Sequence, residues 1–216
     1  LLAALKNTNL FWRSHAQRLL VERGQKDIVP QLLALIADKS VDEIGINAPA
    51  IHALWLLKGL NTIEGDVLKA VFEATKHPSA GVRKTAVHLL PRNTEGGDFI
   101  LKNNLLEDKE PLVVLNTLLA LSEMPLNEQA ETVILQKIET SKDLNDRWLP
   151  DAYACILSKN DRLFKKVLDT QIAKAASNAK TMDEHAGHHD HSAMMPKKEQ
   201  KAAAISPNKP DLIVSN

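Results

Sequence analysis

The chain has 216 residues, enough for a sizeable core, with 27 Lys and Arg against 27 Asp and Glu and a single cysteine. Zero net charge removes the general basic field of non-specific nucleic-acid binders. One cysteine excludes an internal disulfide, a Cys-x-x-Cys zinc site and a Cys-x-x-Cys-His haem attachment site. No apolar run approaches the roughly 18 residues of a membrane span, so we expect no direct membrane span. The chain opens on Leu1 inside an apolar pattern, without a signal peptide, from which we expect a segment of a longer protein.

A short pattern of a small residue followed by a Leu pair recurs along the first part of the chain. It is clearest in 12–20 and 82–90, and 49–57, 113–121 and 148–156 follow the same frame with exchanges. The small positions lie roughly 31 to 37 residues apart, a period typical of repeats of two helices; they are Ala16, Ala53, Ala86, Thr117 and Ala152. We expect these positions to let the helices of a unit approach to about 8–10 Å.

A second helix is expected after each of these segments, over 28–37, 67–76, 98–106, 128–140 and 162–176. Pro30 is tolerable only in the first turn of its helix, and Ser79 is expected to cap the helix that follows Pro78. Alternation with a strand period is absent outside short stretches. The sequence therefore predicts an all-α fold, an α-α superhelix of about five helix pairs over 1–176.

The pattern resembles that of HEAT repeats, most closely at 81–90, which reads Gly-Val-Arg-Lys-Thr-Ala-Val-His-Leu-Leu. Segments 11–23 and 51–60 are also similar to the HEAT region of membrane-bound-dehydrogenase-like proteins, the PVC-type haem-binding CxxCH family. That resemblance implies an extracytoplasmic parent protein with a β-propeller before this region and a cytochrome c domain after it. Haem c would then belong to the parent only, and no catalytic or haem residue carries over to this chain.

Composition changes near residue 176. We expect a disordered linker rich in His, Met and Lys over 177–208 and the first strand of a following domain over 209–216. Imidazole suits Cu(II) and Zn, and thioether suits Cu(I), so the linker contains candidate ligands for Cu or Zn; these are His185, His188, His189, His191, Met194 and Met195. Their spacing is irregular, and a polar linker that binds no metal is the alternative.

The remaining histidines and the cysteine have structural interpretations. His15 and His52 share a repeat position, and we expect both at the surface or half-buried. His77 ends a helix, where its cation could interact with the helix dipole. Cys155 lies beside Ile156 and Leu157, so we expect a buried, inert thiol.

Arginines and tryptophans could instead mark an interaction surface. Arg13 and Arg83 are equivalent in the repeat, but other units lack the arginine, so a phosphate-binding ladder for nucleic acid is not expected. For Trp12, Trp55 and Trp148 we favour packing between repeats over contact with a partner.

Within these residues no catalytic set has local spacing support, so we do not expect this segment to be an enzyme. The prediction is a non-catalytic scaffold that docks other proteins, either neighbouring domains or another subunit. One alternative is a metal-handling module that binds Cu or Zn through the His/Met tract. The other is a lyase of the HEAT-like bilin-lyase type.

Overall fold

The computed structural model describes residues 1–140 and 145–186, with side chains described as far as 178. Over these residues all regular secondary structure is helical, and it forms five successive helix pairs. The helices are α1 (Leu10–Arg23), α2 (Val29–Ala37), α3 (Ala48–Gly59), α4 (Gly65–Ala74), α5 (Ala80–Leu89), α6 (Thr94–Lys102), α7 (Pro111–Leu121), α8 (Glu128–Thr140), α9 (Leu149–Ser158) and α10 (Asp161–Ala186). Two short 3-10 helices, η1 (Leu2–Lys6) and η2 (Leu105–Glu107), precede α1 and α7.

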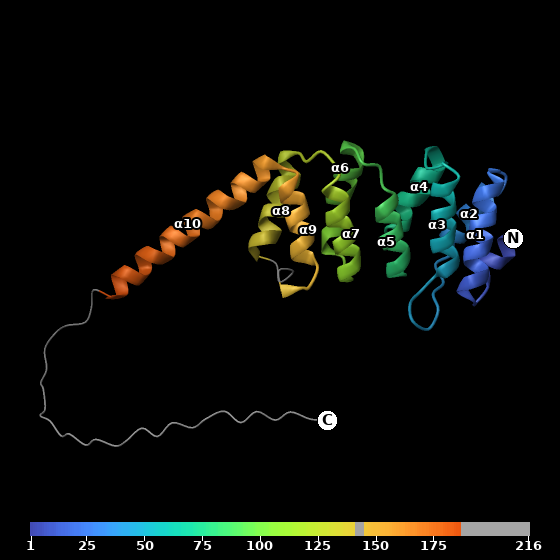
Figure 1. Cartoon of the computed structure of the whole chain (residues 1–216), viewed down its shortest axis with the longest axis horizontal. Coiled ribbons are helices and arrows are strands. Elements are labelled where there is room, and N and C mark those ends of the chain that lie inside the picture. The colour runs from blue at the N-terminus through green and yellow to red at the C-terminus, as the bar shows by residue number, and fades with distance from the viewer. Residues whose placement is uncertain (141–144, 187–216) are drawn as a thin grey trace, which may run out of the picture. The chain divides into compact units, whose positions relative to one another are not determined.

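The first helices of the pairs form one layer of the region 1–172 (Figure 1). In this layer α1 contacts α3, α3 contacts α5, α5 contacts α7, and α7 contacts α9. In the second layer α2 contacts α4 and α6 contacts α8, while Phe72 of α4 and Phe99 of α6 stack with ring centroids 4.3 Å apart. This arrangement confirms the predicted all-α, α-α superhelix.

The small repeat positions lie where the units are in contact. Every one is buried, which is compatible with close packing of helices at these positions: Ala16, Ala53, Ala86, Thr117 and Ala152. Close approach is also visible at Gly81, where an added Cβ would lie 2.8 Å from Cδ1 of Ile51 on the neighbouring helix α3. The core between the layers is continuous and consists mainly of Leu, Ile, Val and Ala. Thin helical layers therefore explain the low aromatic content of the chain.

Local signals account for most helix ends. Asn9, Asn47 and Asn93 each accept a backbone N–H bond at the start of a helix. Gly24 ends α1 with a φ of 68°, a left-handed conformation that glycine adopts without steric cost. Ser79 differs from the expectation: it stands at the N-cap position of α5, but its hydroxyl accepts from the Asn47 backbone N–H at 3.3 Å instead of capping its own helix.

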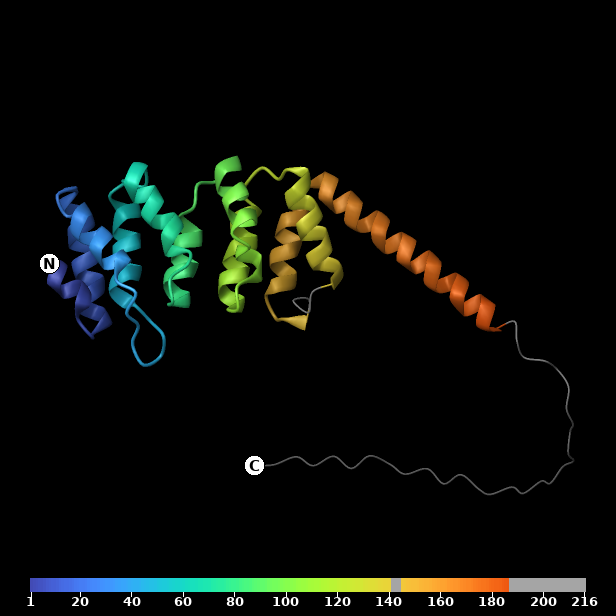
Figure 2. The same ribbon diagram turned by 180° about the vertical axis from the view of Figure 1, so that it is seen from behind.

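The segments that precede α3, α5 and α7 lie at one edge of the stack, which we call the loop edge: 38–47, 75–79 and 103–110. Segment 38–47 projects beyond the helix ends in both views (Figures 1 and 2). The loop edge is where the first helices begin, so their first turns and the long segment before α3 meet there.

The second compact unit, 173–216, is described only as far as the end of α10. The helix continues past Ala176, where composition suggested that the helical region ends, and stops at Ala186. Alanine and lysine, which favour helix, dominate 173–180 and explain the extension. The remainder of the expected linker, to 208, and the expected strand over 209–216 lie outside the described residues.

Candidate functional site

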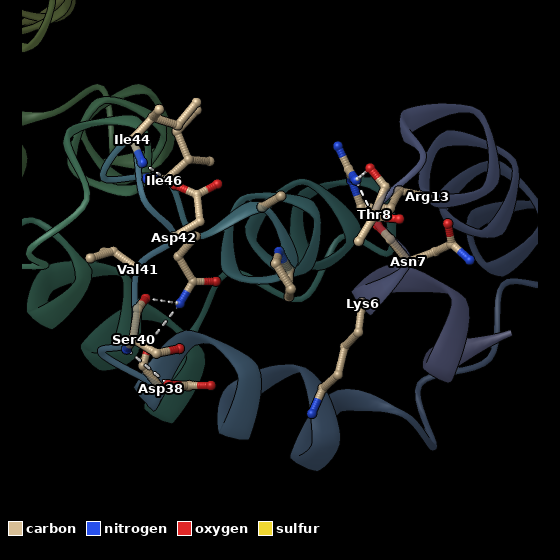
Figure 3. Close-up of a pocket in the computed structure, with 13 residues that line it drawn as sticks. Lys6, Asn7, Thr8, Arg13, Asp38, Ser40, Val41, Asp42, Ile44 and Ile46 are labelled. Carbon is tan, nitrogen blue, oxygen red and sulfur yellow. Dashed lines mark hydrogen bonds between the residues drawn. The ribbon is translucent and has the colours of Figure 1, made fainter.

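A pocket of about 590 Å³ opens at the loop edge beside the first two helix pairs (Figure 3). One wall consists of the end of η1 and the start of α1, including Lys6 and Arg13. The opposite wall is the segment 38–47, and the first residues of α3, Ala48 and Pro49, line the pocket between them. The two walls differ in chemistry: cations stand on the first, and exposed aliphatic side chains stand on the second.

Arg13 is held in place on the cationic wall. Its Nη1 donates to the backbone carbonyls of Asn7 and Thr8, at 2.6 and 2.8 Å, and so ties α1 to the segment that precedes it. Its Nε donates to Nε2 of His52 on α3 at 3.3 Å. These contacts use three of the five guanidinium N–H groups and fix the plane of the group, and the two N–H groups of Nη2 remain.

His52 must be neutral to accept this bond. Its Nδ1 lies 2.6 Å from Oε1 of Gln17, so Nδ1 carries the proton and Nε2 accepts from Arg13. Burial and the nearby Arg13 charge both lower the pKa of His52 below its usual value. The half-buried position of His52 and the exposed position of His15 agree with the expectation from the repeat.

The opposite wall is organised by Asp42. Its carboxylate accepts the backbone N–H groups of Ile44 and Ile46 at 3.1 and 2.8 Å, which folds the segment back on itself. This fold leaves the aliphatic side chains outward: Val41 is 45% exposed, Ile44 78% and Ile46 38%. Asn47 fixes the base of the segment by donating to the carbonyls of Asp38 and Ser40. Val41, Ile44 and Ile46, which we call the aliphatic ridge, are therefore carried by a hydrogen-bonded loop.

A chain of hydrogen bonds joins this segment to the rest of the loop edge. Nδ1 of His77 accepts from the Ser79 backbone N–H at 2.9 Å, so its Nε2 carries the proton and donates to the carbonyl of Asp38. Burial lowers the pKa of His77 despite the bond to Asp38, and the side chain is 1% exposed. The expectation of a His77 cation at a helix end is therefore wrong: the imidazole is a neutral bridge between two loops.

Arg83 makes the next connection. Its Nη1 donates to the carbonyls of His77 and Pro78, and its Nε and Nη2 bind the two carboxylate oxygens of Asp108 at 2.7 and 2.8 Å. Both side chains are 9% exposed. Burial alone would raise the pKa of Asp108, but the hydrogen bonds from Arg83 and from the Glu110 backbone lower it. Arg83 is thus a buried structural residue.

Three other side chains that were expected to be packed or buried are exposed. Trp12 and Trp148 are 54% and 53% exposed, so packing between repeats does not describe them, although Trp55 is half-buried against the core. Trp12 meets Phe11 edge-on, with ring centroids 5.2 Å apart. Cys155 is exposed, because α9 buries the stripe that contains Ala152 and Ile156 and turns Cys155 away from it.

Only one of the candidate metal ligands lies within the described chain. His185 lies in α10 next to its last residue, and His188, His189, His191, Met194 and Met195 lie outside the described residues. Where side chains are described, no three His, Cys, Asp or Glu residues are grouped so as to hold a metal ion. Over the same residues no helix is both long and apolar enough to cross a membrane.

Sequence reasoning missed Lys6 and the aliphatic ridge of 38–47. A signal was present, because Val41, Ile44 and Ile46 are three aliphatic residues in a segment that separates two helices and is itself too polar for a helix. No protein-family model matches the chain, and no curated protein matches it significantly.

Proposed function

We propose that this region is a non-catalytic HEAT-like scaffold that docks another protein at the loop edge. The observation that carries the proposal is the aliphatic ridge of Val41, Ile44 and Ile46, which is exposed beside a pocket yet fixed by hydrogen bonds. An apolar surface that is ordered before binding costs little conformational entropy when a partner covers it. Exposed apolar groups in contact with a pocket are also a common feature of protein interaction sites.

The stacked helices would supply the rigidity that docking needs. The ridge is anchored through Asn47 and Asp38, and Asp38 accepts from His77 of the following unit. Displacing the ridge would therefore break bonds in two units. In repeat proteins each unit contacts its neighbours only, and such stacks offer extended binding surfaces.

Site-specific photo-crosslinking tests this function. A benzoylphenylalanine at position 44 is expected to crosslink a protein of the native host, and the adduct is identified by mass spectrometry. The control places the same group at Lys69, which is 78% exposed on α4 and away from the ridge. The same adducts from both positions, or none from position 44, would contradict the proposal.

The wider context rests on the resemblance to membrane-bound-dehydrogenase-like proteins. We place the scaffold in an extracytoplasmic redox protein of dehydrogenase or cytochrome c type, where the partner is a neighbouring domain or another subunit. Fractionation of host cells with an antibody against this region tests the location, and haem staining of the detected band tests for covalent haem. Detection in the cytosol without haem would count against this context.

Metal handling is a second function that the His/Met tract supports. Four histidines and two methionines lie between 185 and 195, a density of soft and borderline ligands that suits Cu or Zn. Calorimetric titration of a 177–200 peptide with Cu and Zn tests it, with a peptide of the same length in which every His and Met is replaced by Ala as the control. We expect a dissociation constant below about 100 μM, and weaker binding would remove this function.

A further inference from the structure

We propose that the pocket at the loop edge binds a carboxylate in an extended segment of a partner protein, with the Nε and Nη2 edge of Arg13 as its main donor. This inference rests on the proposed docking function and names the chemistry that the partner must present. It follows from the comparison of two arginines that occupy the same repeat position but have different surroundings.

Arg13 and Arg83 are each the fourth residue of their helices, α1 and α5. Each donates from Nη1 to the backbone carbonyls of the two residues immediately before the N-cap of its helix. These are Asn7 and Thr8 for Arg13, and His77 and Pro78 for Arg83. The shared Nη1 contacts orient both guanidinium groups in the same way relative to their own helices. The Nε and Nη2 edge is therefore directed toward the following unit in both cases.

At Arg83 this edge is occupied by a carboxylate. Asp108, in the segment before α7, accepts from Nε and Nη2 in a fork, the strongest geometry for an arginine and a carboxylate. At Arg13 the corresponding edge has only the imidazole Nε2 of His52, at 3.3 Å from Nε. Among the described residues, Nη2 of Arg13 has no hydrogen-bond partner, and Arg13 lines the pocket. The pocket thus lies where the repeat elsewhere places a carboxylate.

The other charged residues of the pocket are Lys6, Asp38 and Asp42, and they are divided between its two walls. Lys6 stands on the same wall as Arg13, and within the described residues its ammonium group has no hydrogen-bond or ion-pair partner (Figure 3). The carboxylates of Asp38 and Asp42 line the opposite wall, where that of Asp38 accepts from the Ser40 backbone N–H and that of Asp42 from Ile44 and Ile46. An anionic group that enters the pocket is therefore drawn to the wall of Lys6 and Arg13 and kept from the wall whose carboxylates are already hydrogen-bonded to their own loop.

The aliphatic ridge identifies the ligand as part of a peptide. Ile44 and Val41 flank the pocket with exposed apolar surface that a lone small acid would leave uncovered. An extended segment with an Asp or Glu between aliphatic residues satisfies both walls: its carboxylate reaches Arg13, and its neighbours cover Ile44. The ligand is therefore such a segment, because the cations of one wall require a carboxylate and the apolar surface of the other wall requires aliphatic neighbours.

Titration of the full chain with two peptide pools tests the proposal. Both pools contain acetylated, amidated hexapeptides with aliphatic residues at random around a fixed central residue, Asp in one pool and Asn in the other. Binding is followed by NMR through the Nε–H resonance of Arg13 in protein labelled with nitrogen-15. The Asp pool is expected to shift this resonance and to bind about tenfold more tightly than the Asn pool.

Variants identify the donor. Arg13→Gln is expected to weaken binding of the Asp pool about tenfold or more, while Arg23→Gln, at an exposed arginine of the same helix, leaves it unchanged. Because Arg13 also holds its own N-terminal segment, two further variants guard against a folding effect. Lys6→Gln removes only the second cation and is expected to weaken binding by a few fold. His52→Glu supplies an internal carboxylate to Arg13 and is expected to abolish binding while the melting temperature is retained.

The outcomes separate this inference from the docking function. If the Asp and Asn pools bind equally, or if Arg13→Gln and Lys6→Gln leave binding unchanged, the carboxylate is excluded although crosslinking from position 44 still supports docking. If sodium acetate binds as tightly as the Asp pool, the site accepts a small acid and the peptide is excluded. If crosslinking fails but the Asp pool binds at Arg13, the pocket chemistry stands and the scaffold function falls.

Discussion

Arg13 and Arg83 make the same two backbone contacts at the start of their helices, yet only Arg83 meets a carboxylate, that of Asp108. The shared contacts show that this arginine ties the first helix of a unit to the segment before it. The unshared contact shows where two units are joined by charge. An arginine at this repeat position thus always ties its helix to the preceding segment, but it forms an ion pair with the next unit only where that unit supplies a carboxylate.

Asp108→Asn is expected to lower the free energy of unfolding by about 2 kcal/mol. The substitution leaves Arg83 buried with one neutral acceptor in place of a forked carboxylate. Urea denaturation followed by circular dichroism measures the change. The control, Asp66→Asn, breaks an exposed pair with Lys69 and is expected to change nothing measurable. Equal effects of the two substitutions would show that the Arg83 pair contributes no more than a surface pair.

Gly96→Ala is expected to destabilise the protein by about 2 kcal/mol, because the added Cβ would overlap the backbone carbonyl oxygen of Pro91. Gly97 provides a matched control in the same turn of α6. A Cβ at Gly97 would meet nothing closer than 3.9 Å, and alanine favours helix, so Gly97→Ala is expected to be neutral or to stabilise by up to about 1 kcal/mol. Thermal unfolding of both variants checks the difference, and a harmless Gly96→Ala would disprove the close packing of α6 on the Pro91 turn.

Stability is expected to fall as the pH falls below 6.5. Burial is the main cause of the lowered pKa of His52, His77 and His88 in the folded chain. As the pH falls, these histidines are therefore protonated in the unfolded chain before they are protonated in the folded chain, and the free energy of unfolding decreases. Above about pH 7.5 these histidines are neutral in both states and contribute no slope. Chemical denaturation between pH 5 and pH 8 measures the effect.

His77→Gln isolates the contribution of one histidine. The glutamine keeps a donor and an acceptor without the titration, so its stability is expected to depend less steeply on pH between about 7 and 5 than that of the parent chain. His15→Gln, at an exposed site on α1, serves as the control for the exchange of a histidine for a glutamine. Parallel curves for the parent and His77→Gln would mean that His77 is not a neutral bridge.

Glu131→Gln is expected to loosen the start of α10. The Glu131 carboxylate, on α8, is 1% exposed and accepts from Nε of Arg162 at 2.6 Å and from Nζ of Lys166 at 2.8 Å. Because both cations are partly solvated, the expected loss is about 1–2 kcal/mol. Hydrogen exchange measured by mass spectrometry should rise in 161–170. Glu128→Gln removes a more distant, exposed partner of Arg162 and should leave the exchange unchanged.

The helices and their buried faces were predictable because the repeat encodes them locally. Ala53 and Ala86 are buried where the frame of small residues and Leu pairs placed them. Local pattern did not determine which flank of an apolar stripe meets a neighbour. Cys155 stands beside the buried Ile156 and is exposed, and Trp12 lies four residues before the buried Ala16 and is exposed.

The candidate site was not predictable, because its geometry depends on contacts between units. The segment 38–47 owes its position to the bond between Asp38 and His77 and to the contact of Asn47 with Ser79, each of which joins residues far apart in the sequence. The role of Arg13 likewise depends on His52 of the next unit. Such pairs become visible only when the stacking of the units is known.

The bonds along the loop edge also determine how the stack can bend. Buried connections from Asp38 to His77 and from Arg83 to Asp108 resist separation of the units at this edge. At the opposite edge, where the first helices end, Arg92 and Glu123 form a pair that is partly exposed to solvent. Thermal bending is therefore expected to open the far edge and to pivot about the loop edge. A ligand bound at the loop edge would therefore be displaced less by this bending than one bound at the far edge.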